Sequence, residues 1–253
     1  MISTRLSAEA DAAAHRYGLM IESWRAFYRA AMNDRDLGSA AQMNRIAGQA
    51  YETAKIYLAN ERRSLEDTSF GIASEAHWAT LEQIVVDVAD ELPLAVSEHL
   101  EALVEYVLNE IAIQIERDIA FLKQSLQRAS LQIRLSARSR RTTIRAATLE
   151  YRIGNVAELD FFFHDRRNMK WPSRKFIRAI WRQHLLAVYN ETALIELAEH
   201  GHDIAEIWHP SPNSEVYGMR LSMKSSGALP TYSEVRNQAF HPNSDAIIVP
   251  ARA

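Results

Sequence analysis

Residues 93–149 read PLAVSEHLEALVEYVLNEIAIQIERDIAFLKQSLQRASLQIRLSARSRRTTIRAATL, the longest stretch of the chain without an internal helix breaker. Pro93 suits the first turn of a helix, and neither proline nor glycine follows it before Gly154. The stretch predicts one helix over about residues 93–149, either the seam of a coiled coil or an unusually long bundle helix. Its apolar residues recur at steps of three and four: Leu100, Val104, Val107, Ile111, Ile115, Ile119, Leu122 and Leu126.

Charge is segregated along this predicted helix and the segment that precedes it. Between Glu82 and Asp118 there are ten acidic residues and one basic residue, Arg117, whereas residues 119–149 contain seven basic residues and no acid. Acids near the N-terminus of a helix and bases near its C-terminus are stabilised by the helix dipole. The segregation therefore supports a long helix in this direction.

The rest of the chain predicts a mainly α fold, an N-terminal long-helix bundle followed by a small α+β C-terminal unit. Three helices are expected before Pro93, over about residues 8–32, 39–65 and 74–91, with turns at 35–38 and 67–71. We predict a domain boundary near residue 150, which gives a bundle over residues 1–150 and the α+β unit over 151–253.

The last hundred residues predict mixed structure. A helix is expected over residues 173–199, after Pro172 and before the stop signal Gly201. Short strands are expected over about residues 203–208 and 246–249, with turn-forming stretches between them.

Composition limits the function classes. The chain has 253 residues, 47% hydrophobic, with a net charge of −3 and no cysteine, so disulfides and thiolate zinc sites are excluded. No stretch approaches the roughly 20 apolar residues of a membrane span. Glycine-rich phosphate loops and the common hydrolase motifs are also missing. We therefore expect a structural or binding protein without a cofactor rather than an enzyme.

Two groups of side chains remain as candidates for binding. Four histidines in the C-terminal region could gather around a metal, but their spacing does not support a site, and we favour surface or capping roles for His200, His202, His209 and His241. A run of arginines could contact nucleic acid phosphates or an acidic partner; a solvated helix face is the plainer interpretation. These residues are Arg128, Arg134, Arg138, Arg140, Arg141 and Arg145.

The C-terminal region resembles the phage Mu F-like head morphogenesis proteins, which are portal-associated minor capsid proteins. The resemblance lies in the order of a helix RAIWRQHLLAVYNETALIELAEHG, a strand region DIAEIWHPSPNSEVYG and an end HPNSDAIIVP. It covers roughly residues 150–250. The residues that match the motif are Trp208, His241, Pro242, Asn243 and Pro250.

The chain departs from the family at the four cysteine positions, which correspond to Tyr217, Arg220, Ser244 and Ala246. A metal or disulfide role of those cysteines cannot operate here, and we expect packing to hold the fold instead. The resemblance implies a virion component made in the host cytoplasm. It would be present in a few copies inside the capsid at the portal vertex, and act in head assembly or genome delivery.

The resemblance also implies partners, namely the portal protein and other capsid components, with no stable membrane span. An alternative is an internal ejection protein of the virion, a helical protein that contacts packaged DNA without reading its sequence. A third hypothesis, an enzyme that uses the C-terminal histidines, would require a stoichiometric bound metal.

We expect the apolar stripe of the long helix to be buried against helices of its own chain or another copy. Replacing both Ile111 and Ile115 with aspartate should then disrupt folding or assembly by several kcal/mol, because charged groups would enter an apolar core. Thermal unfolding and assembly assays would measure the effect. Unchanged thermal stability and assembly would contradict a buried stripe.

Overall fold

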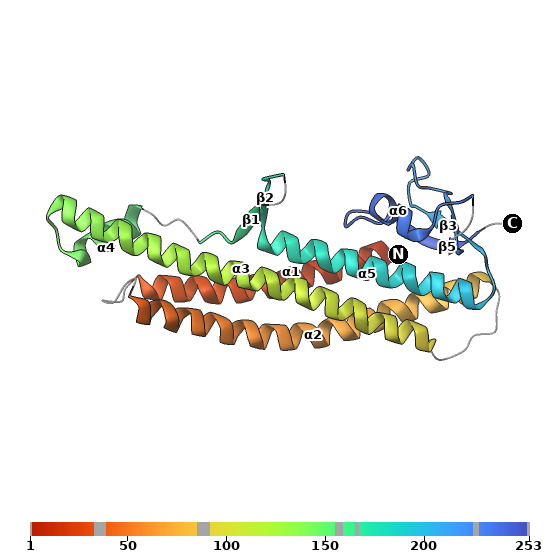
Figure 1. Ribbon diagram of the computed structural model, residues 1–253, viewed down its shortest axis with the longest axis horizontal. Helices are drawn as coiled ribbons and strands as arrows, with labels where there is room; N and C mark the ends of the chain where they lie inside the picture. Colours follow the sequence, from red (N-terminus) through yellow and green to blue (C-terminus); the bar gives the residue numbers. More distant parts are fainter. Residues whose placement is uncertain are drawn as a thin grey trace. The chain divides into compact units, whose positions relative to one another are not determined.

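The computed structural model describes residues 2–32, 39–84, 92–154, 159–164, 167–224 and 228–251, and only the backbone of residues 152–154 and 163–164. Figure 1 shows the course of the chain. Its elements are α1 (Ile2–Ala31), α2 (Ala40–Ile84), α3 (Leu94–Arg140), α4 (Ile144–Gly154), β1 (Phe162–His164), β2 (Lys170–Pro172), α5 (Ser173–Glu199), β3 (Ile204–Trp208), β4 (Arg220–Ser222), α6 (Tyr232–Ala239) and β5 (Ile247–Pro250).

The predicted mainly α fold with a small C-terminal α+β part is confirmed, since helices account for 74% of the structure. Among the described residues, no helix combines the length and the apolar content needed to span a bilayer. The predicted turn at 35–38 and the last turns of the predicted helix 74–91 lie outside the described residues.

The contacts divide the chain into two compact units. Unit 1 comprises Met1–Ala13, Glu61–Leu108 and Arg178–Ala253, and unit 2 comprises Ala14–Asn60 and Asn109–Ile177. Both units take residues from each side of position 150. The two units are groups of residues in contact with one another, which need not fold independently. The division into domains 1–150 and 151–253 therefore stays a prediction.

The predicted break between the second and third helices is wrong, because α2 continues through residues 67–71. The acidic and hydroxyl residues there favour a turn by propensity, but the buried residues Leu65, Ser69, Ile72 and Ala76 keep helical spacing. Burial of that face outweighs local propensity. Gly71 suits the packing in unit 1, since a Cβ there would lie 2.9 Å from the Arg5 guanidinium.

The helix predicted over residues 93–149 is interrupted near its C-terminal end. Helix α3 stops at Arg140, and Arg141 adopts a left-handed conformation with φ of 53°. Thr142 N donates to Ala137 O at 3.0 Å, and Arg141 N donates to Arg138 O, which together form a Schellman cap. The Thr143 hydroxyl then accepts from Ala146 N at 3.2 Å, and this bond caps α4.

The apolar stripe of α3 is buried as predicted, with Ile111 fully buried and Ile115 2% exposed. In unit 2, helices α1, α2 and α3 contact one another. The Trp24 indole donates to the Thr53 hydroxyl at 2.7 Å, and Tyr51 on α2 donates to Glu116 on α3 at 2.7 Å. Helices of the same chain therefore cover the stripe.

A buried carboxylate links α1, α3 and the start of α5 in unit 2. Asp118 accepts hydrogen bonds from the Tyr17 hydroxyl at 2.7 Å, the Ser173 hydroxyl at 2.9 Å and the Gln114 amide at 3.0 Å. Burial raises the pKa of Asp118 to about 6, although these donors oppose the rise. Burial and the neighbouring Asp118 also raise the pKa of Tyr17 well above its ordinary value.

The C-terminal strands form a three-stranded antiparallel sheet in the order β4-β3-β5. The strands predicted near 203–208 and 246–249 correspond to β3 and β5, whereas β4 and α6 were not predicted. In unit 2, strand β2 pairs with β1 in antiparallel register.

The limits predicted for helix 173–199 are confirmed by α5. Gly201 has φ of 75°, His202 N donates to Leu197 O at 2.9 Å, and Gly201 N donates to Ala198 O at 3.1 Å. This is a Schellman cap with glycine at the left-handed position.

Replacing Arg141 with glycine should stabilise the protein by about 1 kcal/mol, because a left-handed conformation costs a non-glycine residue about 1–2 kcal/mol. The free energy of unfolding from urea denaturation would measure the gain. Arg138→Gly is the matched control and should destabilise by about 1 kcal/mol, since Arg138 lies inside α3. A loss of stability in Arg141→Gly would instead indicate a continuous helix.

Candidate functional site

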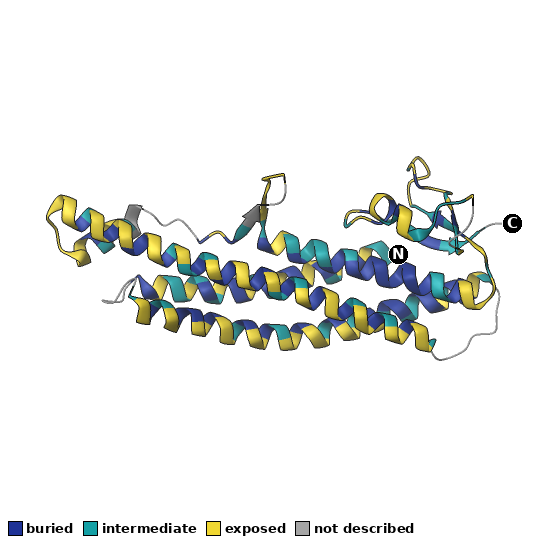
Figure 2. Cartoon of the chain, in the orientation of Figure 1, coloured by how far each residue is buried: buried dark blue, intermediate teal, exposed yellow. Residues whose placement is uncertain are grey.

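Helix α5 carries the most concentrated set of buried polar side chains in the described part of unit 1. Every residue from Trp181 to Ala193 except Gln183 is buried, so this part of the helix is covered on all sides; it is largely dark blue in Figure 2. Buried polar groups require hydrogen-bond partners. The polar residues concerned are Arg182, His184, Asn190, Glu191, Thr192 and Glu196.

Arg182 holds the segment that begins at the His-Pro-Asn motif. Its Nη1 donates to Pro242 O at 2.6 Å and to Ser244 O at 2.7 Å, and its Nη2 donates to Asp245 Oδ1 at 2.5 Å. Its Nε donates to the Ser7 hydroxyl of α1 at 3.1 Å. The side chain is only 5% exposed, so a planar guanidinium with five donors is well suited to this position.

The motif segment is a tight turn with its own hydrogen bonds. Asn243 N donates to His241 Nδ1 at 3.2 Å, and Ser244 N donates to His241 O at 2.8 Å. Ser244, at a family cysteine position, donates from its hydroxyl to Ala239 O at 2.5 Å and accepts from Ala246 N at 3.1 Å. Ala246, at another such position, is fully buried. Hydrogen bonds and packing therefore stabilise these two positions.

Asn190 attaches β5 to α5. Ile248 N donates to Asn190 Oδ1 at 2.8 Å, and Asn190 Nδ2 donates to Ala246 O at 3.4 Å. The buried face of the sheet includes Ala205, Ile207, Leu221 and Ile248. The opposite face of the sheet, which includes Trp208 and Ile247, is thereby left half-exposed.

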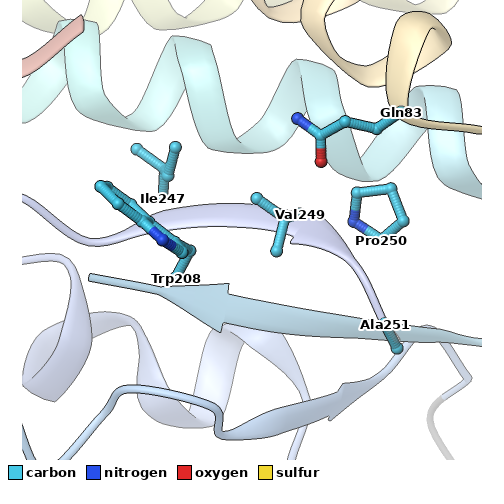
Figure 3. A pocket seen from close by; sticks show the side chains of 6 residues that line it. All are labelled: Gln83, Trp208, Ile247, Val249, Pro250 and Ala251. Atoms are coloured by element: carbon cyan, nitrogen blue, oxygen red, sulfur yellow. The ribbon is translucent and has the colours of Figure 1, made fainter. Parts of the chain in front are cut away.

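An open apolar pocket of about 500 Å³ lies on that opposite face (Figure 3). Trp208 pairs with Ile247 in the register of β3 and β5, and Val249 follows two residues along the same face. Gln83 from α2 lies across from Val249 and Pro250 in Figure 3. Two residues of the family motif, Trp208 and Pro250, therefore line one pocket.

Two buried histidines of unit 1 pair with partners on α5 or α2. His184 Nε2 lies 2.7 Å from the Ser69 hydroxyl, and His77 Nδ1 lies 2.6 Å from Glu196 Oε1. Serine beside histidine is also the arrangement of a nucleophile and its general base. Burial lowers the pKa of His184 to about 3, however, and a general base needs a pKa near the working pH. The pair therefore lacks the basicity that nucleophilic catalysis requires.

A second polar cluster surrounds Glu191, which is 9% exposed. Its carboxylate bonds to His99 Nε2, accepts from the Tyr232 hydroxyl at 3.1 Å, and lies 3.4 Å from the Arg236 guanidinium. Burial, followed by the charge of Glu191, raises the pKa of Tyr232. The cluster connects α3, α5 and α6 within unit 1.

Three of the four C-terminal histidines, His200, His209 and His241, bond to nearby backbone. His200 Nδ1 lies 2.9 Å from Glu196 O, and His209 Nδ1 accepts from Ser211 N at 3.0 Å. His241 makes the turn contact described above. In the part of the chain that the structure describes, no three carboxylate or imidazole side chains are grouped so that they could hold a metal.

The six arginines singled out in the sequence are all exposed and belong to unit 2. Four of them, Arg128, Arg134, Arg138 and Arg140, lie on α3, Arg141 lies at the break, and Arg145 lies on α4. Arg140 pairs with Glu150 at 2.5 Å. The helix break thus separates this group into two parts.

Comparison of the chain with protein-family models, curated proteins and solved structures gave no match.

Replacing Arg182 with methionine should destabilise the protein by about 3–5 kcal/mol, because the buried carbonyls and Asp245 would lose their donors. Urea denaturation would measure this. Arg178→Met, four residues earlier, removes an exposed pair with Asp11 and should cost under about 1 kcal/mol. Equal losses in the two variants would contradict the role assigned to Arg182.

His184 should make the fold acid-sensitive. Its pKa is about 3 when folded and near 6.5 when unfolded, so only the unfolded chain takes up the proton between these values. Stability should fall as pH drops below about 6.5, by up to about 1.4 kcal/mol per pH unit. His184→Gln should remove this slope in urea denaturation curves recorded at several pH values. An unchanged slope in that variant would refute the assignment.

Asp118 serves as a control, because its effect on the pH dependence of stability has the opposite sign to that of His184. Its pKa rises from 3.8 to about 6 on folding, so its contribution to stability is lost as pH increases through about 6. As pH rises from about 4 to 6, the free energy of unfolding of the wild type should therefore decrease relative to that of Asp118→Asn.

Proposed function

We propose that this chain is a structural, non-catalytic minor head protein of a phage, bound near the portal inside the capsid. In this role it acts in head assembly or genome delivery. The proposal rests on the resemblance of the C-terminal region to the Mu F-like family. The observation that supports it best is that the separated motif segments pack together in unit 1.

Three contacts support this argument. Trp208 on β3 pairs with Ile247 on β5, and Pro250 ends the same strand. Arg182, from the motif helix, bonds to the carbonyls of Pro242 and Ser244. A fortuitous match of short motifs would give no reason for these segments to contact one another.

The altered cysteine positions are compatible with the proposal. The Ser244 hydroxyl bonds within the turn, and Ala246 is buried against its surroundings. The turn is therefore closed by hydrogen bonds and apolar packing at two of the positions where the family has cysteines.

The open pocket beside Trp208 and Pro250 suits a binding role. A half-exposed tryptophan in an apolar pocket offers a large contact area, which is typical of residues that dominate protein interfaces. We therefore assign the contact with the portal or a capsid protein to this face of the sheet.

The test is affinity purification of the tagged protein from its native expression context, followed by mass spectrometry. A portal or capsid protein in a large complex is the expected result. Trp208→Ser should lose that partner, whereas Ile204→Ser, on the same strand and 37% exposed, should keep it. Recovery of a clean monomer without any virion protein would overturn the proposal.

A second candidate function, a DNA-contacting internal or ejection protein, is favoured by the exposed arginines of unit 2. Non-specific binding would weaken steeply with salt, because neutralised phosphates release counterions. Binding of random-sequence duplex DNA that is salt-dependent and reduced by Arg134→Ala with Arg145→Ala would support this alternative. Absence of binding at low salt would exclude it.

A further inference from the structure

An acidic groove lies between α2 and α3 in unit 1. It has a volume of about 410 Å³, a floor that includes the buried side chains of Leu100 and Val104, and an edge at Phe70, which is 58% exposed. Four carboxylates and one guanidinium line it, from Glu66, Asp67, Glu101, Glu105 and Arg62.

The single cation of the acidic groove is already engaged. The Arg62 guanidinium bonds to both carboxylate oxygens of Glu105, with the second at 3.0 Å, and lies 3.6 Å from Glu66. This hydrogen bonding lowers the pKa of Glu105. In the described part of the chain, Asp67 and Glu101 have no ion-pair partner. An occupant of the groove should therefore combine apolar side chains with cationic groups.

A surface with this pattern lies on the C-terminal part of α3, in unit 2. We call Arg128, Leu131, Leu135 and Arg138 the basic stripe, because steps of three, four and three residues place them on one helix face. Leu131 is 59% exposed and Leu135 is 57% exposed, and both arginines are exposed. Neither arginine has an ion-pair partner among the described residues.

We propose that the acidic groove of one copy binds the basic stripe of a second copy of this chain. The two leucines would cover Leu100, Val104 and Phe70. The arginines would reach the carboxylates at the rim. The stripe is roughly 15 Å long, given a rise of about 1.5 Å per residue, which suits a groove between two neighbouring helices. This inference does not depend on the proposed function.

The pattern of the basic stripe favours a protein partner over nucleic acid. Phosphates would pair with the arginines but would leave both leucines in contact with water. A groove with an apolar floor removes them from water, which favours binding in proportion to the apolar area buried. The carboxylates of the acidic groove add charge complementarity, which directs association and fixes the register.

Because each copy carries one groove and one stripe, the contact is between unlike surfaces. Such contacts give a reciprocal dimer, a closed ring or an open chain of copies. The experiment therefore measures assembly without assuming a particular number of copies.

The first test is a charge exchange monitored by sedimentation velocity. A groove-reversed variant, Asp67→Arg with Glu101→Arg, and a stripe-reversed variant, Arg128→Glu with Arg138→Glu, should each assemble at least tenfold more weakly than the wild type. An equimolar mixture of the two should assemble again, because each reversed surface then meets its complement. Wild-type assembly should also weaken as salt increases.

A matched control exchanges exposed charges elsewhere on α2. Glu52→Lys with Lys55→Glu should assemble like the wild type. Circular dichroism and thermal unfolding check that all variants are folded, as expected for substitutions on exposed helix surfaces.

The second test uses the absence of cysteine from the chain. Phe70→Cys and Leu131→Cys, mixed under mild oxidation, should form a disulfide-linked heterodimer. Ile56→Cys, 63% exposed on α2, should not form one with Leu131→Cys. A wild type that is monomeric at every concentration and salt tested would overturn the proposal. So would assembly that neither reversal weakens, a mixture that does not reassemble, or equal cross-linking of the Phe70→Cys and Ile56→Cys variants to Leu131→Cys.

Discussion

The burial of helix α5 on all sides is the constraint on which unit 1 depends. A helix with arginine, histidine, asparagine and glutamate in its buried part is stable only if each polar group finds a partner. These partners come from four directions: Ser7 on α1, Ser69 and His77 on α2, His99 on α3, and the turn and strand at Pro242–Ile248. The polar groups of one helix therefore determine where the other elements of the unit must lie. Apolar packing alone would tolerate several arrangements, whereas unpaired buried groups exclude most of them.

The sequence was sufficient for the class of fold and for α5, because both depend on local signals. Pro172 and Gly201 mark the limits of α5, and the regular apolar spacing on α3 marks its buried face. The errors arise where tertiary contacts outweigh local signals. Asp67–Gly71 has the composition of a turn, but Ser69 is needed on the buried face opposite His184. Arg141 carries no breaking signal, because the left-handed conformation at that position is normally assigned to glycine.

The candidate site was predictable only in part, for a related reason. The motif residues Trp208 and Pro250 could be selected from the resemblance, and they line one pocket. Arg182 could not be selected, since in the sequence it is one basic residue among several between Arg166 and Arg182. Its function depends on three oxygen atoms supplied by residues about sixty positions later. One signal in the sequence points to buried polar contacts on this helix. Polar residues interrupt every face of the predicted helix, and such a helix must either be exposed to solvent or have its polar groups tightly paired.

The contacts of Arg182 also bear on how the protein is made. The Ser3 hydroxyl bonds to Asp245, across a separation of 242 residues, and Arg182 reaches both of these residues. Closing a loop of that length costs conformational entropy before the contact can form. During synthesis, α5 leaves the ribosome well before the turn that satisfies its arginine, so its apolar and polar faces are transiently uncovered. The arginine of α5 therefore lacks these partners until residues 242–245 have been synthesised.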